Sequence, residues 1–347
     1  GEESKSGDAI CLRFKDSAQR WVTGVIDGGS KDSGEKLCDH IEKYYGTKEI
    51  DFVLNTHPDA DHTSGLISVL EKLIVKKLYM HLPWTHINDI TPFLTDKRVT
   101  KESLLKRMKD NIGYAYELFE LAQKKKIPIE EPFQNVNIHP NFIILGPRKE
   151  FYLEQLINFR AITDYTEDTT GTIFGKAKEI LESTANWVTE NFLTDSLGEP
   201  ADDATSGENN SSVIALLSID DRKSLFTGDA GVPALKDALW DKSISLNFFQ
   251  VPHHGSRRNL GPNILNHLFG KPATYERTKA TAFISAAKKG EPKHPSKKVI
   301  NALIRRGLKV YKTQGVQIHH FSGNISNRGW GPASPVAFYE RVEGDSE

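Results

Sequence analysis

The chain has 347 residues, of which 38% are hydrophobic and 26% charged, and its formal net charge is -1. This length and composition allow a sizeable core in one large or two small domains and are typical of a soluble globular protein. No stretch approaches 18 uninterrupted apolar residues, and residues 1–10 lack a basic segment followed by an apolar one, so we expect neither a membrane span nor an export signal. Two cysteines, Cys11 and Cys38, are too few for a disulfide framework, which favours reduced thiols and a cytoplasmic protein.

The small net charge hides two oppositely charged segments. Residues 251–312 carry 14 Lys and Arg against 2 acidic residues, a local charge of +12. Residues 148–208 carry 5 basic and 13 acidic residues, a local charge of -8. The positive segment suits an anionic substrate. The alternative is that its lysines and arginines are solvated helix faces without a ligand.

Strand and helix patterns alternate along the first 81 residues. The expected strands are residues 7–16, 20–29, 51–55 and 77–81, and the expected helices are residues 35–45 and 64–72. The first two strands predict a hairpin that ends at Asp27, and Ser64 is the expected start of the second helix. This order resembles βαβ units and predicts an α/β fold with layered helices and sheets.

The remaining chain predicts helical segments inserted into the same alternation. Expected helices are residues 101–125, 149–159, 174–192, 232–240, 262–269 and 296–306, and expected strands are residues 141–145, 213–219, 224–227, 246–251, 281–285, 309–312 and 316–321. Residues 197–210 form a polar loop by composition. We therefore expect one domain over residues 1–347, with helical insertions at about 96–130 and 148–208.

Residues 57–62 read HPDADH and place His57, Asp59, Asp61 and His62 directly after the strand expected at 51–55. These side chains cannot all point one way from a helix or a strand, but they can converge from a tight loop at a strand end. Imidazole and carboxylate groups suit zinc, manganese or iron, and two such pairs begin two adjacent sites. A helix N-cap accounts for one aspartate, but not for four ionisable residues together.

Two later strand ends repeat the pattern. Asp229 follows the strand expected at 224–227, and His253 and His254 follow the one expected at 246–251. Each is close to a glycine, which permits a close approach of the backbone. The repetition predicts a dinuclear metal centre assembled from several strand ends.

The ordered motifs IDGG, HPDADH, TGD and HHGS resemble those of the metallo-β-lactamase superfamily. Within it, GDAI at 7–10, NNSSVIAL at 209–216 and KHPSKKVINALIRRGLKVYKTQGVQI at 293–318 resemble standalone relatives of the nuclease-like domain of the bacterial competence DNA-uptake protein ComEC. The resemblance spans nearly the whole chain. It implies an αββα sandwich, two mixed sheets flanked by helices, with a metal site at one edge.

The resemblance also implies roles for individual residues. His57 and Asp59 would bind the first metal ion, and Asp61 and His62 the second. Asp229 would bridge the two ions. Asp61 and Asp229 would therefore belong to the catalytic machinery as well as to the ligand set.

The histidine pair and Asp27 complete this implied centre. His253 would finish the second site, and His254 would support a ligand or contact the substrate, with the reverse order as the alternative. Asp27 would be a carboxylate that orients a metal-binding histidine.

Two positions depart from the usual superfamily pattern. Asp59 stands where histidine is common, and no histidine lies between His139 and His253, where a further ligand is usual. Asn210 takes that place, as it does in the ComEC-like group. The first site would then be oxygen-rich, which favours manganese, or manganese with zinc, over zinc alone, with a single metal ion as the alternative.

Several residues of the basic segment are candidates for contact with the substrate. His294 matches the ComEC-like group, and its imidazole suits binding a phosphoryl oxygen or protonating a leaving group. The alternative is an exposed loop histidine. The further candidate phosphate contacts, whose alternative is ordinary surface charge, are Ser256, Arg257, Arg258 and Lys293.

The predicted activity is metal-dependent phosphodiester hydrolysis by an activated hydroxide, with a nuclease acting on DNA favoured over one acting on RNA. The basic segment and the resemblance support it. One alternative is a hydrolase of small molecules, such as phosphocholine esters or lactones, which a closed pocket would favour. Another is an effector or defence module in which residues 148–208 dock a protein partner or a second copy and regulate a latent hydrolase.

Overall fold

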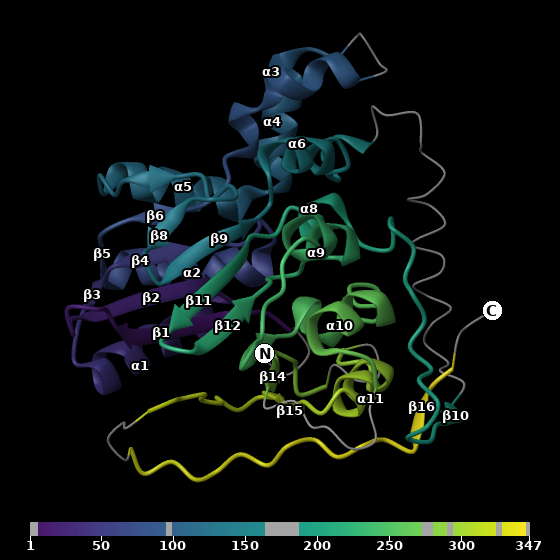
Figure 1. Cartoon of the computed structure of the whole chain (residues 1–347). Coiled ribbons are helices and arrows are strands. Elements are labelled where there is room, and N and C mark those ends of the chain that lie inside the picture. Colours follow the sequence, from purple (N-terminus) through teal and green to yellow (C-terminus); the bar gives the residue numbers. More distant parts are fainter. Residues whose placement is uncertain are drawn as a thin grey trace.

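The computed structural model describes residues 6–94, 99–163, 187–272, 280–289, 294–323 and 328–344. Its two large sheets lie against each other, with helices on their outer faces (Figure 1). None of the helices in these ranges is long and apolar enough to cross a membrane.

The first sheet has five strands in the order β1-β2-β4-β6-β7. Its strands are β1 (Ala9–Lys15), β2 (Trp21–Gly28), β4 (Phe52–Leu54), β6 (Leu78–Tyr79) and β7 (Ile129–Glu130). β1 and β2 form the predicted antiparallel hairpin, and the other neighbours are parallel. The carboxyl ends of β2, β4, β6 and β7 therefore share one edge.

The second sheet has seven strands in the order β15-β14-β13-β12-β11-β9-β8. They are β8 (Asn137–His139), β9 (Phe142–Gly146), β11 (Ile214–Ile219), β12 (Arg222–Phe226), β13 (Phe248–Gln250), β14 (Thr281–Ile284) and β15 (Lys309–Lys312). The four strands from β12 to β15 are mutually parallel, and the others pair antiparallel. Two short pairs complete the strands: β3 (Glu49–Ile50) with β5 (Ile74–Val75), and β10 (Trp187–Thr189) with β16 (Arg341–Glu343).

Helices cover the outer face of each sheet. The larger ones are α1 (Lys31–His40), α2 (Ala60–Lys72), α4 (Lys101–Asn111), α5 (Gly113–Lys124), α6 (Lys149–Ile157), α9 (Val232–Leu239), α10 (Pro262–Phe269) and α11 (Lys297–Arg305). Two are a single turn, α3 (Ile87–Ile90) and α8 (Gly207–Asn210). The π-helix η1 (Ile41–Tyr45) continues α1, and Figure 1 shows α9, α10 and α11 beside the second sheet.

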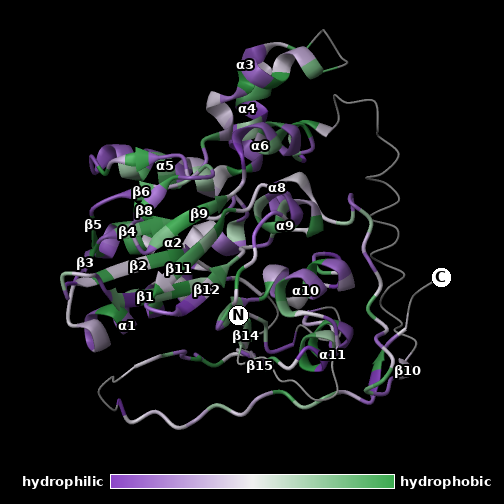
Figure 2. Ribbon diagram, in the orientation of Figure 1, coloured by the Kyte–Doolittle hydropathy of each residue, from purple (hydrophilic) through white to green (hydrophobic). Residues whose placement is uncertain are grey.

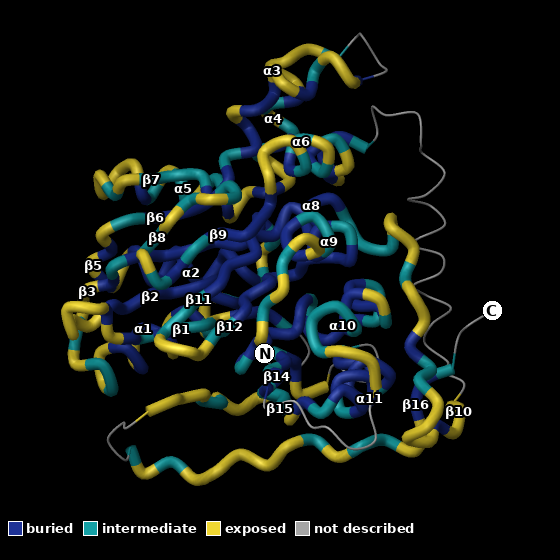
Figure 3. The backbone as a smooth tube through the Cα atoms, viewed as in Figure 1, coloured by how far each residue is buried: buried dark blue, intermediate teal, exposed yellow. Residues whose placement is uncertain are grey.

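The alternation of side chains along each strand divides the core into three parts. In β2, Val25 packs with the helices of the first sheet, whereas Ile26 packs between the sheets. In β11, Ala215 faces the first sheet, and Leu216 packs with α9 and α10. Figure 2 shows the strands as the most hydrophobic elements, and Figure 3 shows them mostly buried. Both faces of both sheets are thus covered, which confirms the predicted αββα layers.

Helix α2 packs unusually close to the end of β2. Gly65 N donates to Gly29 O at 2.9 Å, and a Cβ added at Gly65 would lie 2.0 Å from Gly28 O. Only glycine permits this approach. The contact presses the start of α2 onto the strand end that carries Asp27.

Two expected helices have different bounds in the structure. The second helix begins at Ala60 rather than at Ser64, because Asp59 lies at its N-cap and its backbone oxygen accepts from the His62 and Thr63 amides. The helix expected over residues 101–125 is broken at Ile112, which has φ -107° and ψ 44° and a buried side chain. Burial of Ile112 overrides the continuous helical pattern and turns α5 away from α4.

Two further expectations fail in the segments outside the sheets. The helix expected over residues 174–192 is a strand, β10, at Trp187–Thr189, and residues 174–186 lie outside the described residues. The strand expected over 316–321 is absent, because this stretch lies beyond β15 without a neighbouring strand in the described part of the chain.

Candidate metal centre

The predicted site residues come together because they follow parallel strands. Asp27 lies at the end of β2, and His57 follows β4, its parallel neighbour. Asp229 follows β12, and His253 and His254 follow β13, again a parallel neighbour. The two sheets therefore bring their carboxyl ends to one shared edge.

Asp61 and His62 reach this edge from the first turn of α2. The expectation that all of residues 57–62 form a tight loop is therefore wrong for these two. His57 and His62 still face each other, with ring centroids 4.2 Å apart, because α2 begins only three residues after His57.

The Nε2 atoms of four histidines surround the Asp229 carboxylate. His62 Nε2 lies 3.2 Å from Asp229 Oδ1, and His57 Nε2 lies 3.8 Å from Oδ2. The Nε2 atoms of His253 and His254 approach the same Oδ2 to 3.8 and 3.9 Å. His253 is the one of these five side chains with substantial exposure, 25%, so the cluster is buried except on its side.

Asp27 fixes the orientation of His57 and His62. Its Oδ2 accepts hydrogen bonds from His62 Nδ1 at 2.8 Å and from the Thr56 hydroxyl at 2.6 Å. Because that hydroxyl donates to Asp27, its oxygen accepts from His57 Nδ1, 3.0 Å away. In their neutral form both imidazoles therefore carry the proton on Nδ1 and present a lone pair on Nε2, as a metal-binding histidine does.

His253 and His254 are held in the same way from the second sheet. His253 Nδ1 donates to the side-chain oxygen of Asn259 at 2.7 Å, and the Asn259 amide donates to the backbone oxygen of Asp229 at 2.8 Å. His254 Nδ1 donates to the backbone oxygen of Ser285 at 3.0 Å. Asn259 was missed by the sequence analysis, and its one signal there was its place in the loop that carries both histidines.

Three residues of the centre have left-handed backbone conformations. The φ values are 53° at Asp27, 46° at His253 and 56° at His254. Non-glycine residues adopt this region rarely, at a cost of about 1–3 kcal/mol each, and such residues concentrate at functional sites. The fold therefore accepts backbone strain to aim these side chains.

A third buried carboxylate, Asp8, joins Asp27 and Asp229 at the centre, where the Asp61 side chain is 42% exposed. Gln250 Nε2 donates to Asp8 Oδ2 at 2.6 Å, and burial raises the pKa of Asp8 to about 6. The sequence analysis quoted GDAI as a matching motif but did not assign Asp8 a role. Only packing of the first strand against the second sheet reveals it.

Burial and the carboxylates act in opposite directions on the histidines. Burial lowers the pKa of His57 to about 3. Burial also disfavours charge on His62, but the Asp229 and Asp27 carboxylates prevail and raise its pKa well above the ordinary value. Against burial, the neighbouring histidines hold the pKa of Asp229 well below its ordinary value. The buried carboxylates thus favour a positively charged group within the cluster, such as protonated His62.

The inward-facing atoms fit a bound cation. Among the described residues, Nε2 of His57, His62 and His254 and Oδ1 of Asp229 are buried without a hydrogen-bond partner, which costs about 1–3 kcal/mol each. Three sets of ligand atoms each lie within 4.8 Å of one another: Asp27, His57 and His62; Asp61, His62 and His254; and Asp8, His62 and Asp229. Imidazole nitrogen with carboxylate oxygen is a donor set for divalent transition metals.

Two expected ligands of the first metal, Asp59 and Asn210, have different surroundings. Asp59 is paired with the Arg160 guanidinium, whose Nε also lies 3.1 Å from Glu208 Oε1. Burial, opposed by Arg160, raises the pKa of Asp59 to about 6. The side-chain oxygen of Asn210 is buried, with no hydrogen-bond partner within the described ranges, and a Cβ added at Gly231 would lie 2.4 Å from it. Arg160 was missed because it lies 101 residues from Asp59, in the acidic segment.

The geometry supports the reverse order of the two adjacent histidines. His254 Nε2 lies 3.4 Å from Asp61 Oδ2 and belongs to the same ligand set as His62. His253 instead approaches Asp229 next to His294, whose ring centroid is 5.3 Å from its own. His294 therefore lies beside the cluster, and its contact with a substrate stays a prediction.

The other candidate phosphate contacts are placed differently. Ser256 is buried, and its hydroxyl oxygen accepts from the Arg258 backbone amide at 3.2 Å, so it organises the loop. Arg257 and Arg258 are half-buried, and an Arg257 guanidinium nitrogen lies 3.5 Å from the Gly344 backbone oxygen. Lys293 lies outside the described residues.

Two arginines of the basic segment form buried ion pairs within the fold. Arg305 is 1% exposed, and its Nη2 lies 2.5 Å from Glu190 Oε1. Arg306, equally buried, pairs with Asp195 at 3.1 Å. The expectation that the basic segment suits an anionic substrate is wrong for these two arginines, because carboxylates of the acidic segment neutralise them within the fold.

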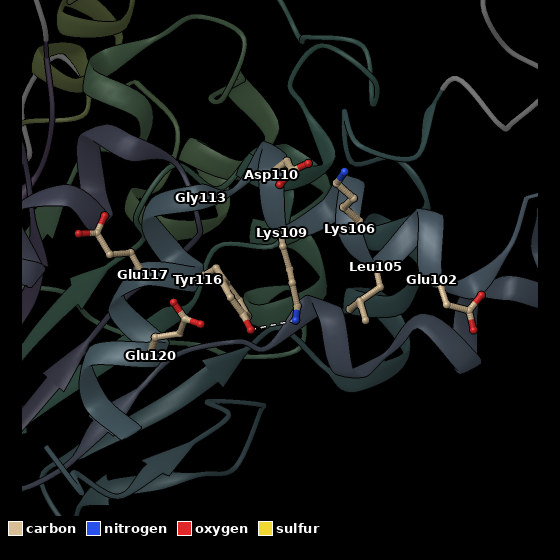
Figure 4. A pocket seen from close by; sticks show the side chains of 9 residues that line it. All are labelled: Glu102, Leu105, Lys106, Lys109, Asp110, Gly113, Tyr116, Glu117 and Glu120. Atoms are coloured by element: carbon tan, nitrogen blue, oxygen red, sulfur yellow. Dashed lines mark hydrogen bonds between the residues drawn. The ribbon is translucent and has the colours of Figure 1, made fainter. Parts of the chain in front are cut away.

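A pocket of about 280 Å³ adjoins the centre and is lined by residues 58–61, residues 111–114 and Arg160. A larger groove of about 680 Å³ runs along α4 and α5, where Lys109 Nζ donates to the Tyr116 hydroxyl at 2.9 Å (Figure 4). The groove shares Gly113 with the smaller pocket but is lined by none of the cluster residues. The smaller pocket is therefore the one that adjoins the candidate metal centre.

Residues 21–138 match the family model of the metallo-beta-lactamase superfamily. No curated protein matches the chain by sequence. Among solved structures, a long form RNase Z from yeast is similar over 94% of this chain, with 11% identity and a TM-score of 0.33. This chain spans 38% of that one, and a likeness this distant carries nothing about activity. The family match and the αββα layers agree with the metallo-β-lactamase fold.

Proposed function

We propose that this chain, whose residues 21–138 match the metallo-β-lactamase superfamily, is a metal-dependent phosphodiester hydrolase. The observation that carries the proposal is the convergence of four histidine Nε2 atoms on the buried Asp229 carboxylate. Every one of these imidazoles is held through its Nδ1, so the cluster is organised before any ligand arrives.

The donor set supports two adjacent ions that share Asp229. Asp61, His62 and His254 would hold one ion, and His57 with His253 a second. Because Asp59 is paired with Arg160, the site formed by His57 and His253 has more imidazole than carboxylate donors. This favours zinc over manganese.

Divalent ions bound here would supply positive charge for a phosphoryl oxygen and lower the pKa of a coordinated water. The chain's own residues provide the rest. Asp27 and Asn259 keep the imidazole lone pairs aimed inward, and Asp229 spans the two groups of donors. His294, next to His253, would donate a proton to the departing oxygen.

We further propose that the substrate is a nucleic acid, with DNA favoured, and that the chain belongs to the ComEC-like branch. Asp59 and Asn210, at positions where histidine is usual, support the branch. The helical segments at about 96–130 and 148–208, which we interpret as insertions, contribute Tyr114 and Arg160 to the pocket beside the centre.

The test combines metal analysis with cleavage assays. The metal content of the purified protein is measured, and the zinc-loaded and manganese-loaded forms are offered labelled single-stranded DNA, duplex DNA and RNA. Asp229→Asn should bind less metal and lose cleavage, whereas Asp241→Asn, a substitution of an exposed carboxylate, should behave as native. A metal-loaded native protein that cuts none of these polymers refutes the nuclease proposal.

A second candidate is hydrolysis of a small phosphodiester. The small volume of the pocket beside Asp61, about 280 Å³, favours it. Turnover of bis(p-nitrophenyl) phosphate without cleavage of any polymer would select this candidate over the nuclease.

A further inference from the structure

The pocket beside the centre joins two segments that are far apart in the sequence. One wall is the start of α2, including Asp59 and Asp61, and the other is the break between α4 and α5, including Tyr114. Arg160, which follows α6, completes it. Asp61 belongs both to the pocket lining and to the candidate metal centre, because its Oδ2 lies 3.4 Å from His254 Nε2.

Tyr114 presents an aromatic ring to this pocket. Its side chain is 40% exposed, although it lies at the second position of α5. The buried Ile112 anchors the helix break and so fixes the position of the neighbouring Tyr114. An exposed ring held on a rigid element is a stacking surface for an unpaired base.

Arg160 places a guanidinium group on the other side of the pocket. Its Nε contacts Glu208 and its Nη2 contacts Asp59, and the side chain is 53% exposed. A guanidinium carries five N–H donors, so donors remain for an oxyanion while these contacts hold the group in place.

Lys31 lies close to the Tyr114 ring and affects which ligands the ring can bind. Its Nζ lies 5.9 Å from the centroid of the Tyr114 ring. A ring already close to an ammonium group is a poor site for a cationic ligand such as a quaternary amine. A neutral base with an attached phosphate suits the combination of Tyr114, Lys31 and Arg160.

We propose that this pocket binds one unpaired nucleotide of the substrate strand, with its base on Tyr114 and its phosphate at Arg160. The proposal rests on the proposed function and narrows it to nucleic acid that is single-stranded at the point of binding. A base within a duplex is stacked on its neighbours and cannot reach a single ring in a pocket of this size.

The test measures binding of a fluorescently labelled single-stranded DNA and of the matching blunt duplex, with a chelator present to prevent cleavage. Tyr114→Ala should weaken binding of the single strand about 5- to 160-fold, the range for losing one stacked base, and leave duplex binding unchanged. Tyr114→Phe should bind as native, since the ring remains. Arg160→Gln should reduce the slope of log K against log salt by about 0.7 in magnitude, the value for one phosphate contact on a single strand.

Trp240→Ala is the matched control, because this aromatic residue is 53% exposed but lies at the end of α9 that points away from Asp229. Should Tyr114→Ala unfold, Tyr114→Gln, which keeps a good helix former, replaces it. Unchanged binding of the single strand by folded Tyr114→Ala or Tyr114→Gln, or an equal loss for the duplex, overturns the proposal. Failure of the proposed function looks different, since the native protein would then cut no nucleic acid at all.

Discussion

Replacing Asp27 by asparagine tests whether the support of His62 sets the metal affinity. Asp27 is 1% exposed and accepts four hydrogen bonds, from His62 Nδ1, from the Thr56 amide and hydroxyl, and from the Asn55 side chain. Asparagine has nearly the same shape and tolerates the left-handed backbone found here, φ 53°. The substitution therefore removes charge and acceptor capacity with little change in packing.

The expected losses follow from this hydrogen-bond count. The single amide oxygen of asparagine has two lone pairs, so two of the four donors lose their acceptor, at about 1–3 kcal/mol for each. Loss of a partner behind a metal-binding histidine lowers metal affinity about 10- to 100-fold, which corresponds to about 1.4–2.8 kcal/mol. Both the metal affinity and the stability of the metal-free protein should therefore fall.

Competition with a chromophoric chelator measures the affinity, and urea unfolding of the metal-free protein measures the stability. Asp51→Asn is the control, because Asp51 Oδ2 accepts from the backbone amide of Thr23. Thr23 lies on β2, as Asp27 does, but far from the centre. It should leave the metal affinity unchanged. If Asp27→Asn binds metal as tightly as Asp51→Asn, the assigned role of Asp27 is wrong.

Three more outcomes are expected from the packing. Arg305→Met should destabilise the protein by about 3–5 kcal/mol in urea unfolding, because it leaves the Glu190 carboxylate buried without its partner. Gly65→Ala should cost about 1–3 kcal/mol in the same assay, since the added Cβ would lie 2.0 Å from Gly28 O. Burial lowers the pKa of His40 to about 4, so the metal-free protein should lose stability as pH falls from about 6.5 to 4, and His40→Phe should remove part of that loss.

The controls for these measurements are equally specific. Lys48→Met breaks an ion pair with Glu42 in which both side chains are exposed, 62% and 38%, and it should cost at most about 1 kcal/mol. Gly198→Ala adds a Cβ with no atom within 4 Å, so it should be nearly neutral. A native-like Arg305→Met, a neutral Gly65→Ala, or an unchanged pH profile for His40→Phe would each contradict its prediction.

Local patterns in the sequence predict most of the layers and most of the cluster. The apolar alternation of β2 and β11 specifies which side chains face each layer, and that pattern depends only on neighbours along the strand. The cluster residues His57, Asp229 and His254 each follow a strand end closely, so their position at an edge is also a local property. The helix bounds near Asp61 and Ile112 were less predictable, because capping and burial there compete with the periodic pattern.

How residues distant in the sequence meet could not be predicted from such patterns. Arg160 pairs with Asp59 across 101 residues, which takes Asp59 out of the expected first site. Asp8 comes to lie beside His254, and Arg305 is neutralised by Glu190 instead of facing a substrate. Sequence patterns report which face of an element is apolar, whereas these pairings depend on the distances that packing of the two sheets and their helices sets between separate elements.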